Sequence, residues 1–390
     1  YVAEDGHMLT NEWKKTVSDD DQDDPDEDGE SWYYFGSKGK KTTSDDKKIN
    51  GKTYFFDEDG KMQYGWYADS NNNVYYLGEE DDGARTNSSW LWLAAPDSED
   101  DDEKDAADAV SHDSQDDDDP CDEEGWYWFG SDGKMYKDAK QKKINGKYYY
   151  FNNHGQMLYE WINGVKANVA SNAKLDSDSI EATASEVRYM NVVEEGWRAD
   201  GWYQIDGAWY FMNADGSLKQ NESFLYDNNL YFVNKSGKMY QNQWLKWDGN
   251  YYYLRSWGGA AHEGWLLLQN KYYYINEDCT RKTDEAFTYD NNLYFVDENG
   301  VMPANQWVIR DGVWYFTYSW GGARKSQWFY YKNNWYYFND DASMQTGWAE
   351  IDGKTYYFQS WGGCVTGTKK IDGTTYVFDK NGVLLSEKES

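Results

Sequence analysis

A short aromatic cluster recurs along this chain about every 21 residues. Seven of the eight steps between successive clusters of the C-terminal half are 21 residues, and the last is 20. A fixed period of this length predicts a repeat protein, in which one small supersecondary unit is stacked on the next. The third residue of each cluster is Phe211, Phe232, Tyr253, Tyr274, Phe295, Phe316, Tyr337, Phe358 or Phe378.

Turn signals separate the aromatic clusters. Asp59-Gly60-Lys61-Met62 and Asn299-Gly300-Val301-Met302 follow clusters, while Asp206-Gly207 and Asp352-Gly353 precede them. Asp-Gly and Asn-Gly between short aromatic runs predict β-hairpins, because glycine tolerates the positive φ that tight turns demand. One hairpin cannot bury its own aromatic face. The sequence therefore predicts an all-β fold, a β-solenoid of stacked hairpins of about 21 residues.

A longer period of 63 residues is superimposed on the short one. The segment 226–233, Tyr-Asp-Asn-Asn-Leu-Tyr-Phe-Val, returns unchanged at 289–296. Two hairpins of each 63-residue unit carry a Trp before the turn, whereas the third carries Phe224 or Phe287 there. This difference separates candidate binding hairpins from purely structural ones.

The formal net charge of −32 is concentrated in two segments. Residues 79–124 hold 20 Asp and Glu against two basic residues, and residues 19–30 add nine acidic residues. Without these segments the remaining net charge is about −5, so the repeats themselves are only mildly acidic. The charge argues against nucleic acid and anionic membranes as partners.

The repeat register lapses at these acidic segments, which divide the chain. We expect N-terminal repeats at 1–78 that begin in mid-repeat, an acidic insertion at 79–124, repeats at 125–165, an insertion at 166–199, and the main repeat array at 200–390. The run 116–119 suggests calcium, but it lacks the spaced pattern of an EF-hand loop, and a hydrated acidic loop is the favoured alternative. Residues 166–195 are a candidate short helix. The mid-repeat start indicates the C-terminal part of a longer protein.

No catalytic chemistry is indicated. Cys121, Cys279 and Cys364 are isolated, so neither a disulfide framework nor a zinc site is expected. No nucleophile elbow, P-loop or H-E-x-x-H motif occurs. We therefore expect no enzyme active site and no cofactor.

Aromatic pairs spaced seven residues apart are the candidate binding residues. The spacing spans a strand, its turn and the start of the return strand, which places the two rings near each other across the hairpin. Converging rings suit a quaternary ammonium such as choline, or the apolar face of a sugar. The alternative is that the rings form the core, as we expect for the middle Tyr of each cluster. The pairs are Trp202 with Trp209, Trp244 with Tyr251, Trp265 with Tyr272, Trp307 with Trp314, and Trp328 with Trp335.

The pattern Gly-Trp, a short turn, Trp-Tyr-Tyr-Phe, Gly-x-Met and again Gly-Trp resembles the choline-binding or cell-wall-binding repeats of Gram-positive surface proteins, which are related to glucan-binding and clostridial toxin C-terminal repeats. The resemblance covers most of residues 31–78, 125–164 and 200–385. It implies pocket rings at the five pairs above and at Trp348 with Tyr356. The chain departs from this pattern in the two Phe hairpins, in Ser-Trp-Gly-Gly turns at 256, 319 and 360, and in the acidic insertions.

Two functional classes follow from the resemblance. The first is a non-catalytic, extracellular module that anchors a larger secreted protein by binding choline-bearing teichoic acid or a glucan polysaccharide. Many weak sites on one molecule would then act together through avidity. The alternative is a structural spacer or a scaffold for another surface protein, in which the rings are mostly core.

Overall fold

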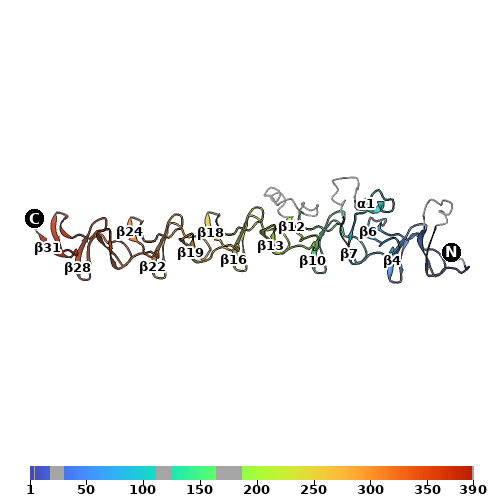
Figure 1. Cartoon of the computed structure of the whole chain (residues 1–390), viewed down its shortest axis with the longest axis horizontal. Coiled ribbons are helices and arrows are strands. Elements are labelled where there is room, and N and C mark those ends of the chain that lie inside the picture. The colour runs from blue at the N-terminus through green and yellow to red at the C-terminus, as the bar shows by residue number, and fades with distance from the viewer. Residues whose placement is uncertain (4, 18–29, 111–123, 164–186, 389–390) are drawn as a thin grey trace. The chain divides into compact units, whose positions relative to one another are not determined.

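The computed structural model describes residues 1–3, 5–17, 30–110, 124–163 and 187–388. The chain divides into two compact units, which are described separately (Figure 1). Unit 1 comprises residues 1–222 and 233–239, and unit 2 comprises residues 223–232 and 240–390. In both units the described chain is built almost entirely of two-stranded antiparallel hairpins, so the all-β prediction is confirmed.

The described residues of unit 1 form seven antiparallel strand pairs, each from consecutive strands. The strands are β1 (Glu12–Val17) with β2 (Glu30–Phe35), β3 (Asp45–Ile49) with β4 (Lys52–Phe56), β5 (Trp66–Ala68) with β6 (Val74–Tyr76), β7 (Ser89–Leu93) with β8 (Gly125–Phe129), β9 (Ala139–Ile144) with β10 (Lys147–Phe151), β11 (Trp161–Asn163) with β12 (Val187–Tyr189), and β13 (Gly201–Ile205) with β14 (Ala208–Met212). Helix α1 (Lys104–Val110) follows β7.

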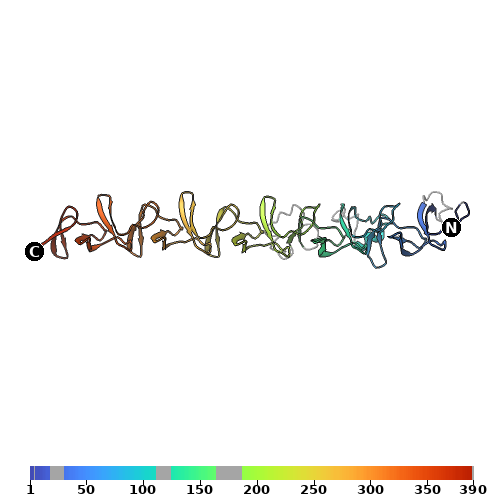
Figure 2. The same ribbon diagram turned by 90° about the horizontal axis from the view of Figure 1, so that it is seen from below.

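Unit 2 continues the same alternation, and successive hairpins project in different directions from the stack (Figure 2). A last strand, β31 (Leu384–Lys388), adds to the final hairpin as a third strand. The paired strands are β15 (Glu222–Tyr226) with β16 (Asn229–Val233), β17 (Gln243–Trp247) with β18 (Asn250–Leu254), β19 (Gly264–Leu268) with β20 (Lys271–Ile275), β21 (Glu285–Tyr289) with β22 (Asn292–Val296), β23 (Trp307–Arg310) with β24 (Val313–Phe316), β25 (Gln327–Tyr331) with β26 (Asn334–Phe338), β27 (Gly347–Ile351) with β28 (Lys354–Phe358), and β29 (Gly367–Ile371) with β30 (Thr374–Phe378).

The hairpin turns have the mirror-image geometry that the sequence predicts. Asp352 and Gly353, between β27 and β28, both have positive φ, at 49° and 72°. Asp290 and Asn291, between β21 and β22, adopt 46° and 58°. Positive φ at both central positions defines a type I′ turn, whose twist matches that of the flanking strands and which Asp, Asn and Gly tolerate best.

Successive hairpins are joined by one recurrent hydrogen bond. After the second strand of a hairpin the chain makes a tight turn, and the last residue of this turn, the turn end, donates its backbone N–H to a carbonyl on the second strand of the preceding hairpin. Met344 donates to Trp314 at 2.8 Å, and Met302 donates to Tyr272 at 2.9 Å. Near the joints a large side chain at the end of the second strand is buried in many hairpins, as with Phe316, Phe338 and Phe358, which are 1%, 0% and 0% exposed. The apolar core is therefore distributed along each unit, and every hairpin depends on its neighbours.

The inserted segments of unit 1 lie between the two strands of a hairpin. Residues 18–29 separate β1 from β2, residues 94–124 separate β7 from β8, and residues 164–186 separate β11 from β12. The predicted insertion at 79–124 is therefore too broad, since it includes strand β7 at Ser89–Leu93, whose register with β8 is continuous. The predicted insertion at 166–199 likewise contains strand β12, Val187–Tyr189.

Helix α1 covers part of the core of unit 1. Its buried residues Ala106 and Val110 pack in a cluster with Trp66, Val74 and Tyr127. The Trp66 indole also donates to the carbonyl of Ala94 at 3.1 Å. The acidic segment thus contributes apolar contacts to the stack as well as charge. The run 116–119, Cys121 and most of the segments 19–30 and 166–195 lie outside the described residues.

Candidate functional site

The clearest candidate site is an aromatic box in unit 2 between two consecutive hairpins. We call it the Trp307 box, and it consists of Trp307, Trp314, Tyr336 and Met344. Trp307 lies on β23 and Trp314 on β24, with ring centroids 6.1 Å apart and ring planes at 85°. Tyr336, from β26 of the next hairpin, approaches Trp307 at 5.0 Å. Three rings from three strands therefore converge on one space.

The backbone fixes this arrangement. Trp307 is paired with Phe316 and Trp314 with Ile309, so strand alternation places Trp307 and Trp314 on the same face of the hairpin. The hydrogen bond from the Met344 backbone N–H to the Trp314 carbonyl brings the methionine beside the exposed Trp314 indole. Trp314 is 41% exposed, whereas Tyr336 is 8% exposed.

A fourth ring comes from a Ser-Trp-Gly-Gly turn. Trp361 lies 6.1 Å from Tyr336 and lines the same cavity. Gly362 has φ of 90°, and a Cβ added there would lie 2.2 Å from the Met344 Sδ. A Cβ on Gly363 would lie 1.9 Å from the Trp361 ring. Both glycines are therefore needed for the turn to fold its own Trp over its backbone and to accept the methionine.

The resulting cavity has a volume of about 300 Å³ and is lined by Trp307, Trp314, Tyr336, Met344 and Trp361. Its walls are ring faces and a thioether. Burial raises the pKa of Tyr336, so this wall carries a neutral phenol at neutral pH. Ring faces attract cations through their quadrupole, and an apolar cage matches the methyl groups of a quaternary ammonium. No carboxylate is among its lining residues, so the rings and the thioether alone give the cavity the chemistry that suits a compact cationic group.

Unit 1 contains an equivalent box, the Trp90 box, formed by Trp90 on β7, Trp126 on β8, Tyr149 on β10 and Met157. Trp90 and Tyr149 are 4.9 Å apart, and the Met157 amide donates to the Trp126 carbonyl at 2.8 Å. This cavity, about 250 Å³, is also lined by the exposed carboxylates of Glu194 and Glu195. Their negative charge favours a cationic occupant further.

Other sets of described residues repeat this arrangement with different walls, including three with a Met or Cys at the turn end. Each of these three has a first-strand Trp, a second-strand ring, a Tyr from the next hairpin, and a residue at the turn end. They are the Trp265 box (Trp265, Tyr272, Tyr294 and Met302), the Trp328 box (Trp328, Trp335, Tyr356 and Cys364), and the Trp13 box (Trp13, Trp32, Tyr54 and Met62).

In the Trp13 box the second ring already has a polar partner. The Trp32 indole donates to Asp81 Oδ1 at 2.9 Å, and Lys15 Nζ lies 3.0 Å from the same oxygen. The hydrogen bond from Trp32 and the neighbouring ammonium of Lys15 hold the pKa of the Asp81 carboxyl below its usual value. The rim of this box is therefore anionic at neutral pH.

The seven-residue spacing located most of the paired rings. Trp202 and Trp209 lie 6.5 Å apart, Trp265 and Tyr272 6.4 Å, and Trp328 and Trp335 6.3 Å, all with nearly perpendicular planes. Trp307 with Trp314 completes this set. Trp244 and Tyr251 both contact the guanidinium of Arg281. The convergence of these pairs is confirmed, and their role in binding stays a prediction.

The proposed pairing of Trp348 with Tyr356 is wrong. Trp348 is opposite Tyr357 and contacts that ring at 5.0 Å, whereas Tyr356 contacts Trp328 at 4.8 Å. The position seven residues after Trp348 is Thr355, which offers no ring. Adjacent residues of a strand face opposite sides, so shifting the pair by one residue moved it to the other face.

The middle Tyr of a cluster can belong to the core and still line a box. Tyr210, Tyr231, Tyr294 and Tyr336 are buried, at 4% to 9% exposed. Tyr336 nevertheless forms a wall of the Trp307 cavity. A ring can therefore pack in the core through one face and line the box through the other.

Several box residues were missed by the sequence argument. Trp361, and Trp320 at 5.9 Å from Tyr294, come from turns that had been regarded only as departures from the pattern. Trp90 and Trp126 were missed because the inserted segment places them 36 residues apart in sequence. A cross-strand register that skips residues 94–124 would have recovered this pair.

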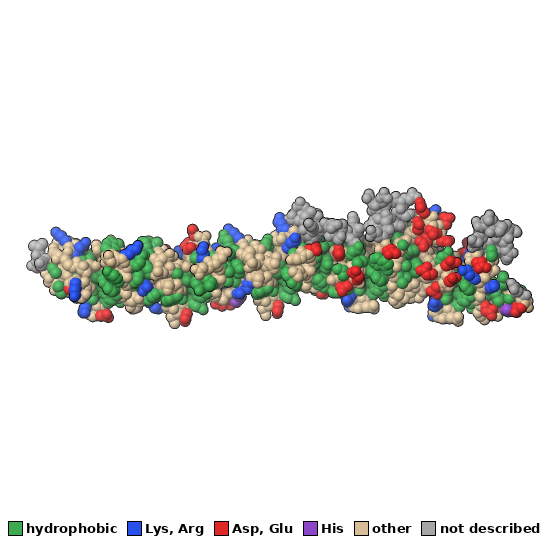
Figure 3. All heavy atoms as spheres, viewed as in Figure 1, with side chains coloured by type: hydrophobic (Ala, Val, Ile, Leu, Met, Phe, Trp, Pro, Cys, Tyr) green, Lys and Arg blue, Asp and Glu red, His purple; other side chains and the backbone are tan. Residues whose placement is uncertain are grey.

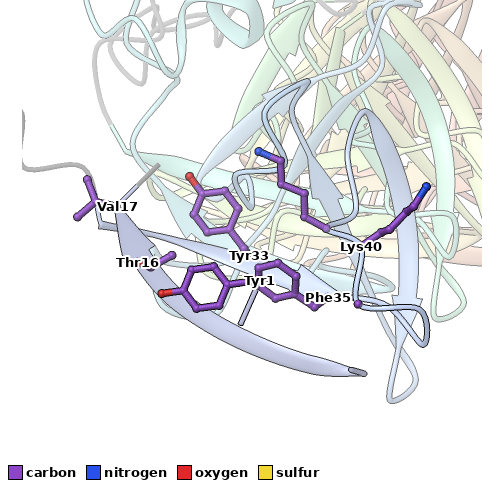
Figure 4. A pocket seen from close by; sticks show the side chains of 8 residues that line it. Tyr1, Thr16, Val17, Tyr33, Phe35 and Lys40 are labelled. Atoms are coloured by element: carbon purple, nitrogen blue, oxygen red, sulfur yellow. The ribbon is translucent and has the colours of Figure 1, made fainter. Parts of the chain in front are cut away.

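A further cavity at the N-terminal end of unit 1 has different walls (Figure 4). Its volume is about 430 Å³, and Tyr1, Tyr33 and Phe35 line it together with Lys40 and Lys41. The Lys41 ammonium already lies 5.8 Å from the centre of the Tyr33 ring. Two lysines make this cavity a poor receptor for another cation.

Acidic side chains are concentrated on the surface of unit 1. On the face shown in Figure 3, Asp and Glu gather over the N-terminal part of the chain, around the segment that follows β6. Among the described residues of this segment are Glu79, Glu80, Asp81 and Asp82. Unit 1 therefore combines its boxes with an anionic surface.

Comparison with known families gives the same interpretation as the geometry. A model of the choline-binding repeat matches residues 43–90. A model of the putative cell wall binding repeat matches residues 27–41, 121–135, 142–157, 200–218, 242–260, 326–341 and 346–364. The chain carries choline-binding repeats. Repeats of this family indicate a cell-wall-binding or choline-binding module and a location at the cell surface.

Several solved structures are similar to this chain, while no curated protein sequence matches it. The modular autolysin LytC of Streptococcus pneumoniae is 23% identical with a TM-score of 0.40; the match covers 77% of this chain and 52% of LytC, so the chain spans about half the length of that relative. Choline binding protein F of the same organism is 22% identical, with a TM-score of 0.37 and coverage of 88% and 100%. The choline-binding domain of CbpL, also from S. pneumoniae, is 26% identical, with a TM-score of 0.39 and coverage of 49% and 100%.

The described part of this choline-binding repeat protein includes no helix with the length and apolarity needed to cross a membrane.

Proposed function

We propose that this chain is a non-catalytic module that binds choline groups of cell-wall polymers through its aromatic boxes and anchors a larger secreted protein at the surface of a Gram-positive cell. The observation that carries the proposal is the Trp307 box. Its rings converge on a cavity of about 300 Å³, and their faces suit the positive charge and the methyl groups of a small quaternary ammonium. The family match supports the same ligand class.

Anchoring follows from repetition. Boxes of the same type occur in both units, at Trp90 in unit 1 and at Trp265, Trp307 and Trp328 in unit 2. A polymer that carries many choline groups engages several boxes at once, and each further contact forms at high effective concentration. Weak individual sites are therefore sufficient for firm attachment to a wall.

The proposal is tested by equilibrium dialysis of choline chloride, with sodium chloride and soluble dextran as controls, on the parent and on Trp314→Ala. Trp314 is 41% exposed, so its removal spares the core and weakens one box. Loss of a cation–π contact of about 0.5–2 kcal/mol corresponds to choline affinity at that box that is about 2- to 30-fold weaker. Leu225→Ala is the matched control, because Leu225 is 75% exposed and lies on a hairpin with Phe224 in the Trp position.

The outcomes separate the ligand classes. Saturable choline binding that is reduced in Trp314→Ala and unchanged in Leu225→Ala supports the proposal. Binding of dextran alone would move the ligand to a glucan, since sugar faces also stack on indoles. If the folded protein binds neither choline nor dextran, the spacer or scaffold function is favoured. Purified cell walls that release soluble fragments in the presence of the chain would contradict a non-catalytic role.

A further inference from the structure

One aromatic box of unit 2 has a cation of its own. The Trp244 box consists of Trp244 on β17, Tyr251 on β18, Tyr273 on β20 and Arg281 at the turn end. Each member lies 63 residues before its counterpart in the Trp307 box, so Arg281 occupies the position of Met344. The backbone joint is also the same, because the Arg281 amide donates to the Tyr251 carbonyl at 2.8 Å.

The guanidinium lies in the space that the rings enclose. Arg281 Cζ is 4.3 Å from the centre of the Tyr251 ring, 4.9 Å from Trp244 and 6.0 Å from Tyr273. All three distances are within the range of a cation–π interaction, which extends to about 6 Å. The three rings that face an open cavity at Trp307 are here arranged around a positive charge supplied by the chain.

Aromatic faces are the main partners of this charge. In the part of the chain described, Arg281 forms no ion pair, and its buried Nε has no hydrogen-bond acceptor. Arg310, by contrast, pairs with the Asp284 carboxylate at 2.7 Å. A Cβ on Gly300, in the next turn, would lie 2.7 Å from the Arg281 Nε, so the side chain is packed against backbone that holds it in place. Burial lowers the pKa of Arg281 from its usual value, which still leaves the group charged at neutral pH.

We propose that Arg281 is a resident cation that closes the Trp244 box to choline. Methionine at the turn end leaves a box open, and arginine fills it from within. The choice of ligand rests on the proposed function, whereas the occupation of the box by the guanidinium does not. A tethered guanidinium is present at high effective concentration, so a soluble cation competes poorly with it.

The chain supplies a template for the reverse change. Arg281→Met would give the Trp244 box the composition Trp, Tyr, Tyr and Met, which is that of the natural Trp265 box. The control is Arg324→Met. Arg324 also lies over rings, at 4.3 Å from Tyr318 and 4.2 Å from Phe329, but it follows the turn end and lies outside the box position.

The test counts choline sites by equilibrium dialysis on the full chain. Arg281→Met is expected to bind one more choline per molecule than the parent, and adding Trp244→Ala should abolish that gain. Arg324→Met should leave the number of sites unchanged. A folded Arg281→Met protein that keeps the parental sites and gains none would overturn the proposal.

A second measurement on the unaltered protein is independent of choline binding. With ¹⁵N-arginine labelling, the Arg281 Hε resonance should be shifted upfield of the exposed Arg255 by the ring currents of the box. An Arg281 resonance at the position of Arg255 would refute the occupation of the box. If the parent binds no choline but the upfield shift is present, the proposed function fails and the resident cation stands.

Discussion

The contact between Gly362 and Met344 allows a prediction that joins the stability of the stack to the shape of a box. In Gly362→Ala, the new Cβ would lie 2.2 Å from Met344 Sδ, and the alanine backbone would have to adopt a φ near 90°. Gly353→Ala is the matched control, since its φ is 72° but nothing lies within 4 Å of its added Cβ. Both substitutions share the backbone penalty, and only the first meets a side chain.

The expected magnitudes follow from these two contributions. A non-glycine residue in the left-handed region costs about 1–2 kcal/mol, and overpacking adds about 1–3 kcal/mol. Gly362→Ala should therefore lower the local opening free energy by about 1–3 kcal/mol more than Gly353→Ala. At about 1.4 kcal/mol per factor of ten, this difference corresponds to hydrogen exchange that is about 5- to 150-fold faster.

The assay is native-state hydrogen exchange at the Met344 amide, whose 2.8 Å bond to the Trp314 carbonyl joins two hairpins. Met344→Ala in the Gly362→Ala background should restore most of the difference, because the clash is then removed. Equal effects of Gly362→Ala and Gly353→Ala, or no rescue by Met344→Ala, would refute the reasoning.

Three further predictions concern burial and charge. Val110→Asp should lower the free energy of unfolding of unit 1 by more than about 2 kcal/mol, because a charge would replace a side chain that is 3% exposed beside Trp66; a thermal melt as stable as the parent's would contradict this. Burial raises the pKa of Cys364 to about 11, so at pH 8 the Cys364 thiol should react with iodoacetamide up to about 100-fold more slowly in native protein than in urea-unfolded protein. Mass spectrometry of the peptide that contains Cys364 measures both rates, and equal rates would show an ionisable, accessible thiol. Burial also raises the pKa of Tyr76 and Tyr210 to about 12 from 10. The unfolded chain loses these protons first, so the free energy of unfolding should fall from pH 10 to 12 in urea titrations, and a flat profile would argue against their burial.

The periodic part of the fold was predictable from sequence because spacing is conserved where packing repeats. The 21-residue period, the hairpin turns and the seven-residue ring pairs all describe local geometry within one hairpin. The seven-residue spacing fails for Trp348, because its hairpin carries Thr355 at the ring position and the adjacent Tyr356 faces the other side of the strand. Strand alternation, applied strictly, would have rejected Tyr356.

The missed features depend on contacts between hairpins. Trp361 comes from a turn 25 residues after the Tyr336 that it meets, and Arg281 reaches rings of an earlier hairpin. No single repeat contains this information. The joint that places the turn end beside the preceding hairpin was visible only in the structure, and it brings the side chain of the turn end, whether Met344, Arg281 or Cys364, against the rings of a box.

The position of the inserted segments has a consequence for how such a chain changes over time and for how it can be engineered. Residues 94–124 are inserted between β7 and β8, and the register of these two strands is continuous. The entropy of closing a loop grows only slowly with loop length. We therefore expect insertions at hairpin tips to be tolerated better than a single-residue register shift inside a strand, which would turn the following side chains to the other face. A foreign epitope or an enzyme grafted at such a tip would leave the order of the boxes along the chain intact.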